Sequence, residues 1–154
     1  MKLSLFLTTH LETILVEWEI FATTLFPASP VPLKHMLRDH AKEILQEIAR
    51  DIEKPQTTRQ QAQKSKGQHP EEVNHKSAAS IHSRLRHISG FTLLQLTSEY
   101  RALRATVFRL WMPHMQHFTS QVASDMMRFN EAMDQALAES VTTFSASADR
   151  TRDT

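Results

Sequence analysis

Scarcity of glycine is the feature that most restricts the fold of this chain. The 154 residues contain only two glycines, Gly67 and Gly90. A fold of many strands needs many tight turns, and the commonest of these require glycine where φ is positive. Helix interiors have no such requirement, so we predict an all-α protein. A chain of this length can also bury a core of its own without disulfides or metals.

Composition excludes several classes of protein. Cysteine is absent, which rules out disulfide frameworks and thiolate metal sites. The formal net charge is only +1, so nothing steers the chain toward nucleic acid or an anionic membrane. The apolar run at the N-terminus stops at Thr8, too early for a signal peptide, and no stretch approaches the ~20 apolar residues of a membrane span. We therefore expect a cytoplasmic protein with neither nucleic acid nor membrane as a partner.

Apolar residues recur at steps of three and four along five segments, which predicts about five helices. Thr8 or Thr9, with Glu12, forms a possible capping box for the first helix, and Gly90 suits a left-handed helix end. In the third helix we expect four residues to face inward: Ala78, Ile81, Leu85 and Ile88. Residues 54–73 contain almost nothing to bury and are predicted to form a mobile loop. The predicted helices cover about 8–25, 32–53, 77–89, 91–112 and 119–148.

The last predicted helix has the pattern of a coiled coil with one four-residue stutter. At ~30 residues it would reach ~45 Å, more than a compact domain of this size requires. We therefore predict a helical body over residues 1–118, followed by a dimerising helix and tail over residues 119–154. The expected partner is a second copy of the chain. The residues expected to pair are Val122, Met126, Phe129, Met133, Leu137, Val141 and Phe144.

Nine histidines raise the question of a metal or haem. None of their spacings matches the four-residue step that puts two zinc ligands on one helical face, so no metal site is predicted. His82 and His87 are the candidates for a haem ligand, although a half-buried or surface histidine is the commoner outcome. We expect no cofactor.

The sequence contains no strong motif for catalysis or for anion binding. The chain has no nucleophile elbow and no glycine-rich phosphate loop, so we predict no enzyme activity. Five arginines on the third and fourth predicted helices could form an anion site, because guanidinium forks suit carboxylate or phosphate. Solvated helix faces explain most such arginines equally well. Arg84, Arg101 and Arg104 are the main candidates, with Arg86 and Arg109 beside them.

An ordered set of short segments resembles a known family. The segments include Ile14–Ala22, Leu37–Ala41, Ser77–His82, Glu99–Ala105 and Arg128–Ser140. Together they resemble the RsbRD-like N-terminal domain of many bacterial sensor histidine kinases. That resemblance implies a globin-like helical bundle that generally lacks haem, dimerises and passes a signal to a kinase core in the same polypeptide. A haem- or ligand-binding globin-type sensor and a stressosome-like scaffold remain alternatives.

Overall fold

The computed structural model describes residues 1–25, 31–54 and 77–153 of the chain. The prediction of an all-α protein is confirmed, since these residues form helices and no strand. Most of the predicted mobile loop at 54–73 lies outside the described residues. The elements are α1 (Leu3–Thr9), α2 (Leu11–Leu25), α3 (Val31–Glu53), α5 (Ala78–Ile88), α6 (Leu93–Trp111), the 3₁₀ helix η1 (Met112–His114) and α7 (Ser120–Asp153).

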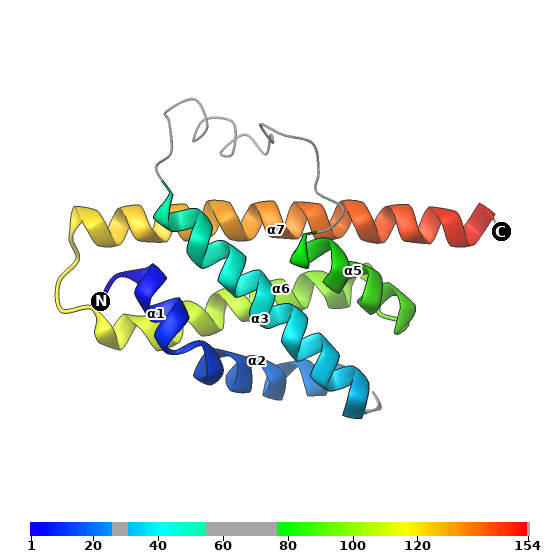
Figure 1. The fold of residues 1–154 in the computed structure, drawn as a ribbon, viewed down its shortest axis with the longest axis horizontal. Helices are drawn as coiled ribbons and strands as arrows, with labels where there is room; N and C mark the ends of the chain where they lie inside the picture. Colours follow the sequence, from blue (N-terminus) through cyan, green and yellow to red (C-terminus); the bar gives the residue numbers. More distant parts are fainter. Residues whose placement is uncertain (26–30, 55–76, 154) are drawn as a thin grey trace.

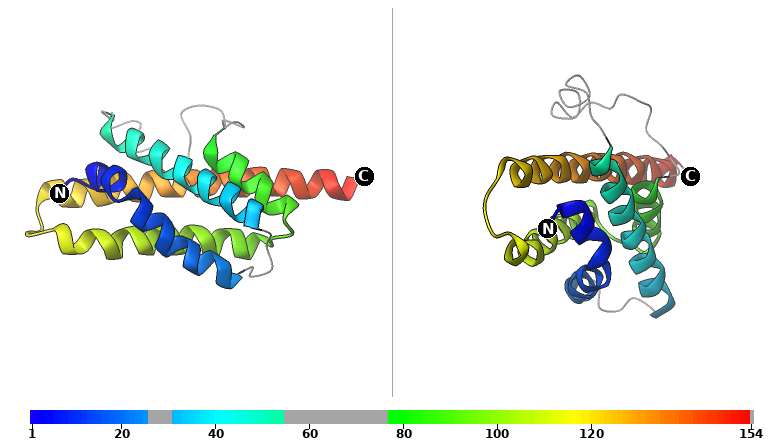
Figure 2. Two further views of the ribbon diagram at one scale, coloured as in Figure 1. Left: turned by 60° about the horizontal axis from the view of Figure 1, so that its bottom comes forward. Right: turned by 60° about the vertical axis from the view of Figure 1, so that its left-hand side comes forward.

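The long direction of the bundle is set by α6 and α7, which run antiparallel (Figure 1). They are connected through η1 at the end of the molecule where the N-terminus also lies. Helix α2 lies along α6, and α3 crosses the bundle obliquely in front of both (Figures 1 and 2). Helix α5 packs against α3 and α7. The C-terminal end of α7 extends past the rest of the bundle in two different views (Figures 1 and 2).

The apolar N-terminus forms a short helix that was not predicted. Helix α1 buries Leu3, Phe6 and Leu7 in the common core, because these residues share one helical face. The backbone N–H of Leu3 donates to Asp125 of α7 at 3.1 Å. The predicted capping box is wrong, since the Thr9 hydroxyl donates back to the carbonyl of Leu5 and α2 begins only at Leu11. The first ten residues are thus part of the bundle.

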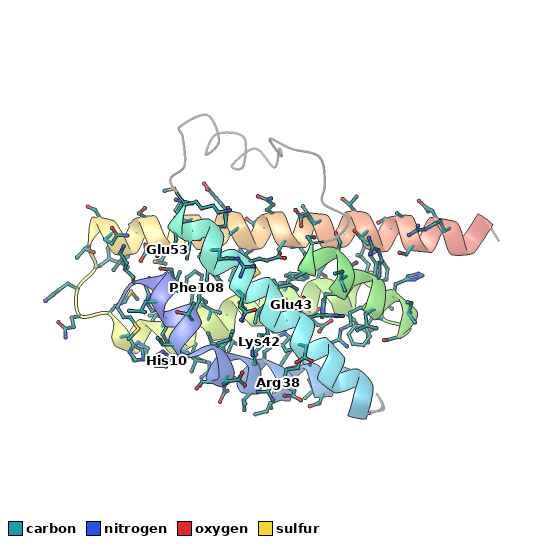
Figure 3. All side chains as sticks on the ribbon, in the orientation of Figure 1. His10, Arg38, Lys42, Glu43, Glu53 and Phe108 are labelled. Atoms are coloured by element: carbon teal, nitrogen blue, oxygen red, sulfur yellow. The ribbon has the colours of Figure 1, made fainter. Side chains whose placement is uncertain are left out.

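Helices α2 and α3 are also connected at the surface. The guanidinium of Arg38 on α3 pairs with Glu12 and Glu19 of α2, and Lys42 lies 3.7 Å from Glu12 (Figure 3). Arg38 and Lys42 are one helical turn apart, so both reach the same helix. Pairs this exposed add little stability, typically about 0–1 kcal/mol each. They fix the register between two helices that the core already holds together.

At the corner between α5 and α6, Gly90 ends the helix as predicted, whereas α6 begins at Leu93 and not at the predicted Phe91. The Ser77 hydroxyl accepts a hydrogen bond from the Ser80 N–H and caps α5. Gly90 has a φ of +84°, the left-handed conformation that ends many helices. Thr92 and Gln95 then form a reciprocal capping box that starts α6. This corner fixes where α5 ends relative to the start of α6.

Helix α7 belongs to the same core as the rest of the chain. Phe129 and Met133 are completely buried, and Phe144 is nearly so, all in contact with residues of the other helices. Val122, Met126 and Leu137 pack half-buried against that core, and Val141 is half-buried as well. The predicted division at residue 118 therefore does not separate two cores. A second copy could reach the buried Phe129, Met133 and Phe144 only if α7 left its own bundle.

Helix α5 is rotated from its predicted orientation. Ile88, expected to face inward, is 79% exposed, and Ile81 and Leu85 are only half-buried. The side chains that α5 buries are instead small or polar: Ala78, Ala79, Ser80, His82, Ser83 and Arg86. The prediction failed because it assumed an apolar interface. The neighbouring helices offer α5 hydrogen-bond partners, and these make burial of its polar face possible.

Candidate functional site

Three charged or chargeable side chains are enclosed together where α5 faces α6. His82 and Arg86 come from α5, one turn apart, and Glu99 comes from α6. Their exposed fractions are 2%, 3% and 1%. One carboxylate oxygen of Glu99 pairs directly with the Arg86 guanidinium, and the other lies 3.7 Å from His82 Nε2. We call these three residues the ionic centre.

Arg86 is held from two sides. Its guanidinium carbon lies 4.2 Å from the centroid of the buried Phe91 ring, and the Glu99 carboxylate lies against its NH2 group. Burial lowers the pKa of Arg86, and the charge of Glu99 opposes that effect. A guanidinium remains charged in proteins, so this position keeps a buried cation that depends on one carboxylate.

The imidazole of His82 is surrounded by side chains from several helices. The rings of Trp18 on α2 and Tyr100 on α6 have centroids 6.2 and 6.3 Å from it. The Trp18 indole N–H donates to the Glu99 carbonyl at 3.3 Å. His40 of α3 lies close enough to His82 to interact with it electrostatically. Burial lowers the pKa of His40 most, and the charge of His82 lowers it further.

The ionic centre contains polar atoms that the described residues do not satisfy. His82 Nδ1, Arg86 Nε and Glu99 Oε1 are buried without a hydrogen-bond partner among those residues. Most buried polar atoms in proteins have a partner, so three orphans in one cluster are unusual. The two atoms of His82 and Glu99 leave room for a different protonation state, and all three leave room for a different geometry. We therefore regard this centre, rather than a surface patch, as the candidate functional site.

A chain of hydroxyl groups connects α5 and α6 to α7. The Tyr100 hydroxyl pairs with the Ser140 hydroxyl, which donates to the Ala79 carbonyl at 2.9 Å. Ser83, next to His82 in the sequence, donates to the backbone carbonyl of Ser140. One turn further along α7, Thr143 donates to Ser80 at 3.1 Å. All these hydroxyl side chains are buried, so α7 is held against α5 by specific polar contacts.

The predicted anion site is divided among different surroundings. Arg104 pairs with Asp134 of α7, Arg109 pairs with Glu17 of α2, and Arg101 is exposed. Arg84 is half-buried on α5. Arg86, named only as an accompanying candidate, is the arginine that is buried and bound to a carboxylate. Its ligand is thus Glu99 of the same chain.

Neither haem candidate is placed to hold the cofactor without rearrangement. His82 is enclosed by Trp18, Tyr100 and Glu99, which a haem would have to displace. The ring of His87 packs edge-on against Phe144 at 5.0 Å. Within the described residues, no group of three or more histidine or acidic side chains could hold a metal ion. In that same part of the chain, none of the helices combines the length and apolarity needed to cross a bilayer.

Two features in the sequence could have pointed to the ionic centre. Glu99 falls on the apolar stripe of its helix, three residues after Leu96 and four before Leu103. A carboxylate on a buried face requires a cation, and His82 and Arg86 share one face of a neighbouring helix at a four-residue step. The isoleucines and leucines of that neighbouring helix favour the opposite orientation, in which its polar face meets solvent.

The architecture defines a class: an all-helical bundle with a buried ionic centre and a long helix that joins the common core. No protein-family model matches this chain, and comparisons with curated proteins and with solved structures found no match. The resemblance to RsbRD-like domains and the globin-like topology therefore stay predictions. The geometry of the ionic centre and of α7 is accordingly the basis for inferring a function.

Because of the hydroxyl chain, we expect two substitutions to lower the free energy of unfolding by unequal amounts. Ser140→Ala should lower the free energy of unfolding by about 1–3 kcal/mol, because it leaves the buried Tyr100 hydroxyl without a partner. Tyr100→Phe should cost less, about 0.5–1.5 kcal/mol, since Ser140 can still donate to Ala79. Urea denaturation of both variants and the double variant measures this. Equal and additive losses would show that the two hydroxyls are not coupled.

His40 should make the fold sensitive to acid. The pKa of His40 is lowered in the folded state. As the pH falls below the ordinary value of 6.5, the imidazole is therefore protonated in the unfolded chain before it is protonated in the folded chain. The free energy of unfolding should therefore fall as the pH drops below about 6.5 and on through the lowered folded pKa. Replacing His40 with glutamine should reduce that slope and leave stability at pH 8 little changed. Urea unfolding at several pH values tests this, with His114→Gln on η1 as the matched control.

Proposed function

We propose that this chain is the signal-input module of a two-component sensor histidine kinase and is itself non-catalytic. It would form a homodimer and relay a stimulus through α7 to a kinase core in the same polypeptide. The observation that carries the proposal is the position of the α5–α7 contact. Ser140 and Thr143 are held by α5, and the exposed positions of the last turns of α7 begin directly after them, at Ser145 and Ala146.

Such an arrangement suits a relay. A closely packed helix can settle in two discrete arrangements instead of sliding continuously, and directional hydrogen bonds help to specify each of them. The α5 face that holds α7 is adjacent to the face that carries the ionic centre. A change at the ionic centre would therefore reach α7 through one short helix.

The geometry also revises how a dimer would form. Since Phe129 and Met133 are enclosed within the chain, we propose that two copies pair through the exposed C-terminal turns of α7 and not through the buried seam. Residues such as Ser145, Ala146, Asp149 and Arg150 are exposed in these turns. Crosslinking of a cysteine introduced at Ala146, compared with one at Met133, distinguishes these modes. Efficient pairing at Met133 in the folded protein would contradict this revision.

The proposal is tested with a chimeric kinase. The full chain is joined through α7 to the dimerisation and ATP-binding domains of a soluble histidine kinase, and autophosphorylation is measured. Ser140→Val, which removes the hydroxyl contact to α5, should change the rate severalfold. Ser145→Val, an exposed position on the same helix, should leave it unchanged. Equal rates for both variants, with helicity and stability retained, would mean that the α5–α7 contact transmits nothing.

A further inference from the structure

The charges of the ionic centre balance only while His82 is neutral. Arg86 then has Glu99 as its counterion, and the buried group carries no net charge. Protonation of His82 would place two cations around one carboxylate in a site nearly closed to water. It would also allow a charge-assisted hydrogen bond from Nε2 to the unpartnered oxygen of Glu99, because an imidazolium is charged and carries a proton on both nitrogens.

That new hydrogen bond requires a movement. His82 Nε2 and Glu99 Oε1 are 3.7 Å apart, and a charge-assisted hydrogen bond forms at about 2.7–2.9 Å. Closing the gap draws this part of α5 toward α6. Ser83, the next residue of α5, donates to the carbonyl of Ser140 on α7. The same displacement thus acts on the contact that holds α7.

Ionisable groups lie on the elements packed around His82. The charge of His82 lowers the pKa of His40 on α3, and Glu43 and Asp39 of the same helix act on His40 in the opposite direction. Glu47 of α3 and Glu139 of α7 act on Tyr100, which flanks His82. Arg86 on α5 and Glu99 on α6 are its charged neighbours in the ionic centre. Trp18 on α2 contributes a ring and no charge.

We propose that protonation of His82 is a stimulus of this domain, converted by the ionic centre into a shift of α5 against α7. The domain would then respond to acidification, because imidazole is the side chain whose charge changes most readily near physiological pH. The link to kinase output depends on the function proposed above. The coupling between His82 and α7 is a property of this chain alone.

The test follows His82 and α7 in the same protein. NMR of the full, unmodified chain records the histidine ring resonances from pH 8 to pH 5, with the His82 signal assigned by its absence in His82→Gln. Amide hydrogen exchange of α7 is measured over the same range and corrected for the intrinsic pH dependence of exchange. We expect the His82 signal to titrate as one proton and the protection around Ser140 to change with it.

Two variants separate the proposal from its alternatives. His82→Gln should abolish the pH-dependent change in α7 protection, while His114→Gln, at an exposed histidine on η1, should retain it. If His82 stays neutral to pH 5, or titrates without any change in α7, the proposal is overturned. If His82→Gln does not fold, the His82 signal is assigned by its proximity to the Trp18 and Tyr100 rings, and the titration of the unmodified chain still decides. A coupled titration without any response of the chimeric kinase would overturn only the proposed function.

Discussion

Replacing Glu99 with glutamine is expected to lower the free energy of unfolding by about 3–5 kcal/mol. The substitution preserves the shape of the side chain but leaves Arg86 as a buried cation without a counterion. Removing one partner of a buried ion pair is costly for this reason, whereas removing both is often tolerated. Urea denaturation monitored by circular dichroism at pH 8 gives the change directly.

The control for Glu99→Gln is a surface pair between α2 and α6. Glu17 and Arg109 lie 3.0 Å apart but are largely exposed, so Glu17→Gln should cost less than about 1 kcal/mol. The double variant Arg86→Met with Glu99→Leu should recover most of the loss, because no unpaired charge remains. A Glu99→Gln variant as stable as Glu17→Gln would show that the Arg86–Glu99 pair is not buried in solution.

Phe129→Ala is expected to cost about 3–5 kcal/mol as well, through a different mechanism. Phe129 is completely buried, and its ring meets that of Phe108 edge-on with centroids 5.2 Å apart. Truncation removes apolar contact and leaves a cavity that the surrounding helices fill only partly. The exposed position Met127→Ala, two residues earlier on α7, should cost about 1 kcal/mol or less.

Phe129→Ala also distinguishes two roles for the apolar face of α7 that contains Phe129, called the seam here. If Phe129 packs within its own chain, the urea midpoints of wild type and variant should depend on protein concentration to the same extent over a hundredfold range. If the seam instead pairs two chains, the wild-type midpoint should rise with concentration by mass action and the variant should lose that rise. Should Phe129→Ala fail to fold, Phe129→Leu serves as a milder truncation with the same readout.

Much of the fold could be predicted because its signals are local. The break after α5 needs a residue that tolerates positive φ, and Gly90 is there. The α6 cap requires only Thr92 and Gln95, three positions apart. The apolar period of α7 likewise predicts a long helix from the sequence alone. Each of these features depends on residues within a few turns of one another.

The features that could not be predicted from the sequence depended on what lies across an interface. The periodicity of α7 identifies one apolar face but cannot tell whether that face meets its own chain or another copy. The N-terminal apolar run is too short for a signal peptide, yet it completes the core beside Trp111, whose indole donates to the Met1 carbonyl. Neither partner is adjacent in the sequence, so neither contact has a local signature.

Helical composition, the positions of the helix ends and the apolar stripes were determined by the sequence itself, because backbone hydrogen bonding and helix capping involve neighbouring residues. Only the tertiary structure decided which face of α5 is buried. His82 and Arg86 can be buried because Glu99, thirteen residues beyond Arg86, lies opposite them on α6. The cost of burying a charge depends on the group that faces it, and that group is known only once the helices are packed together.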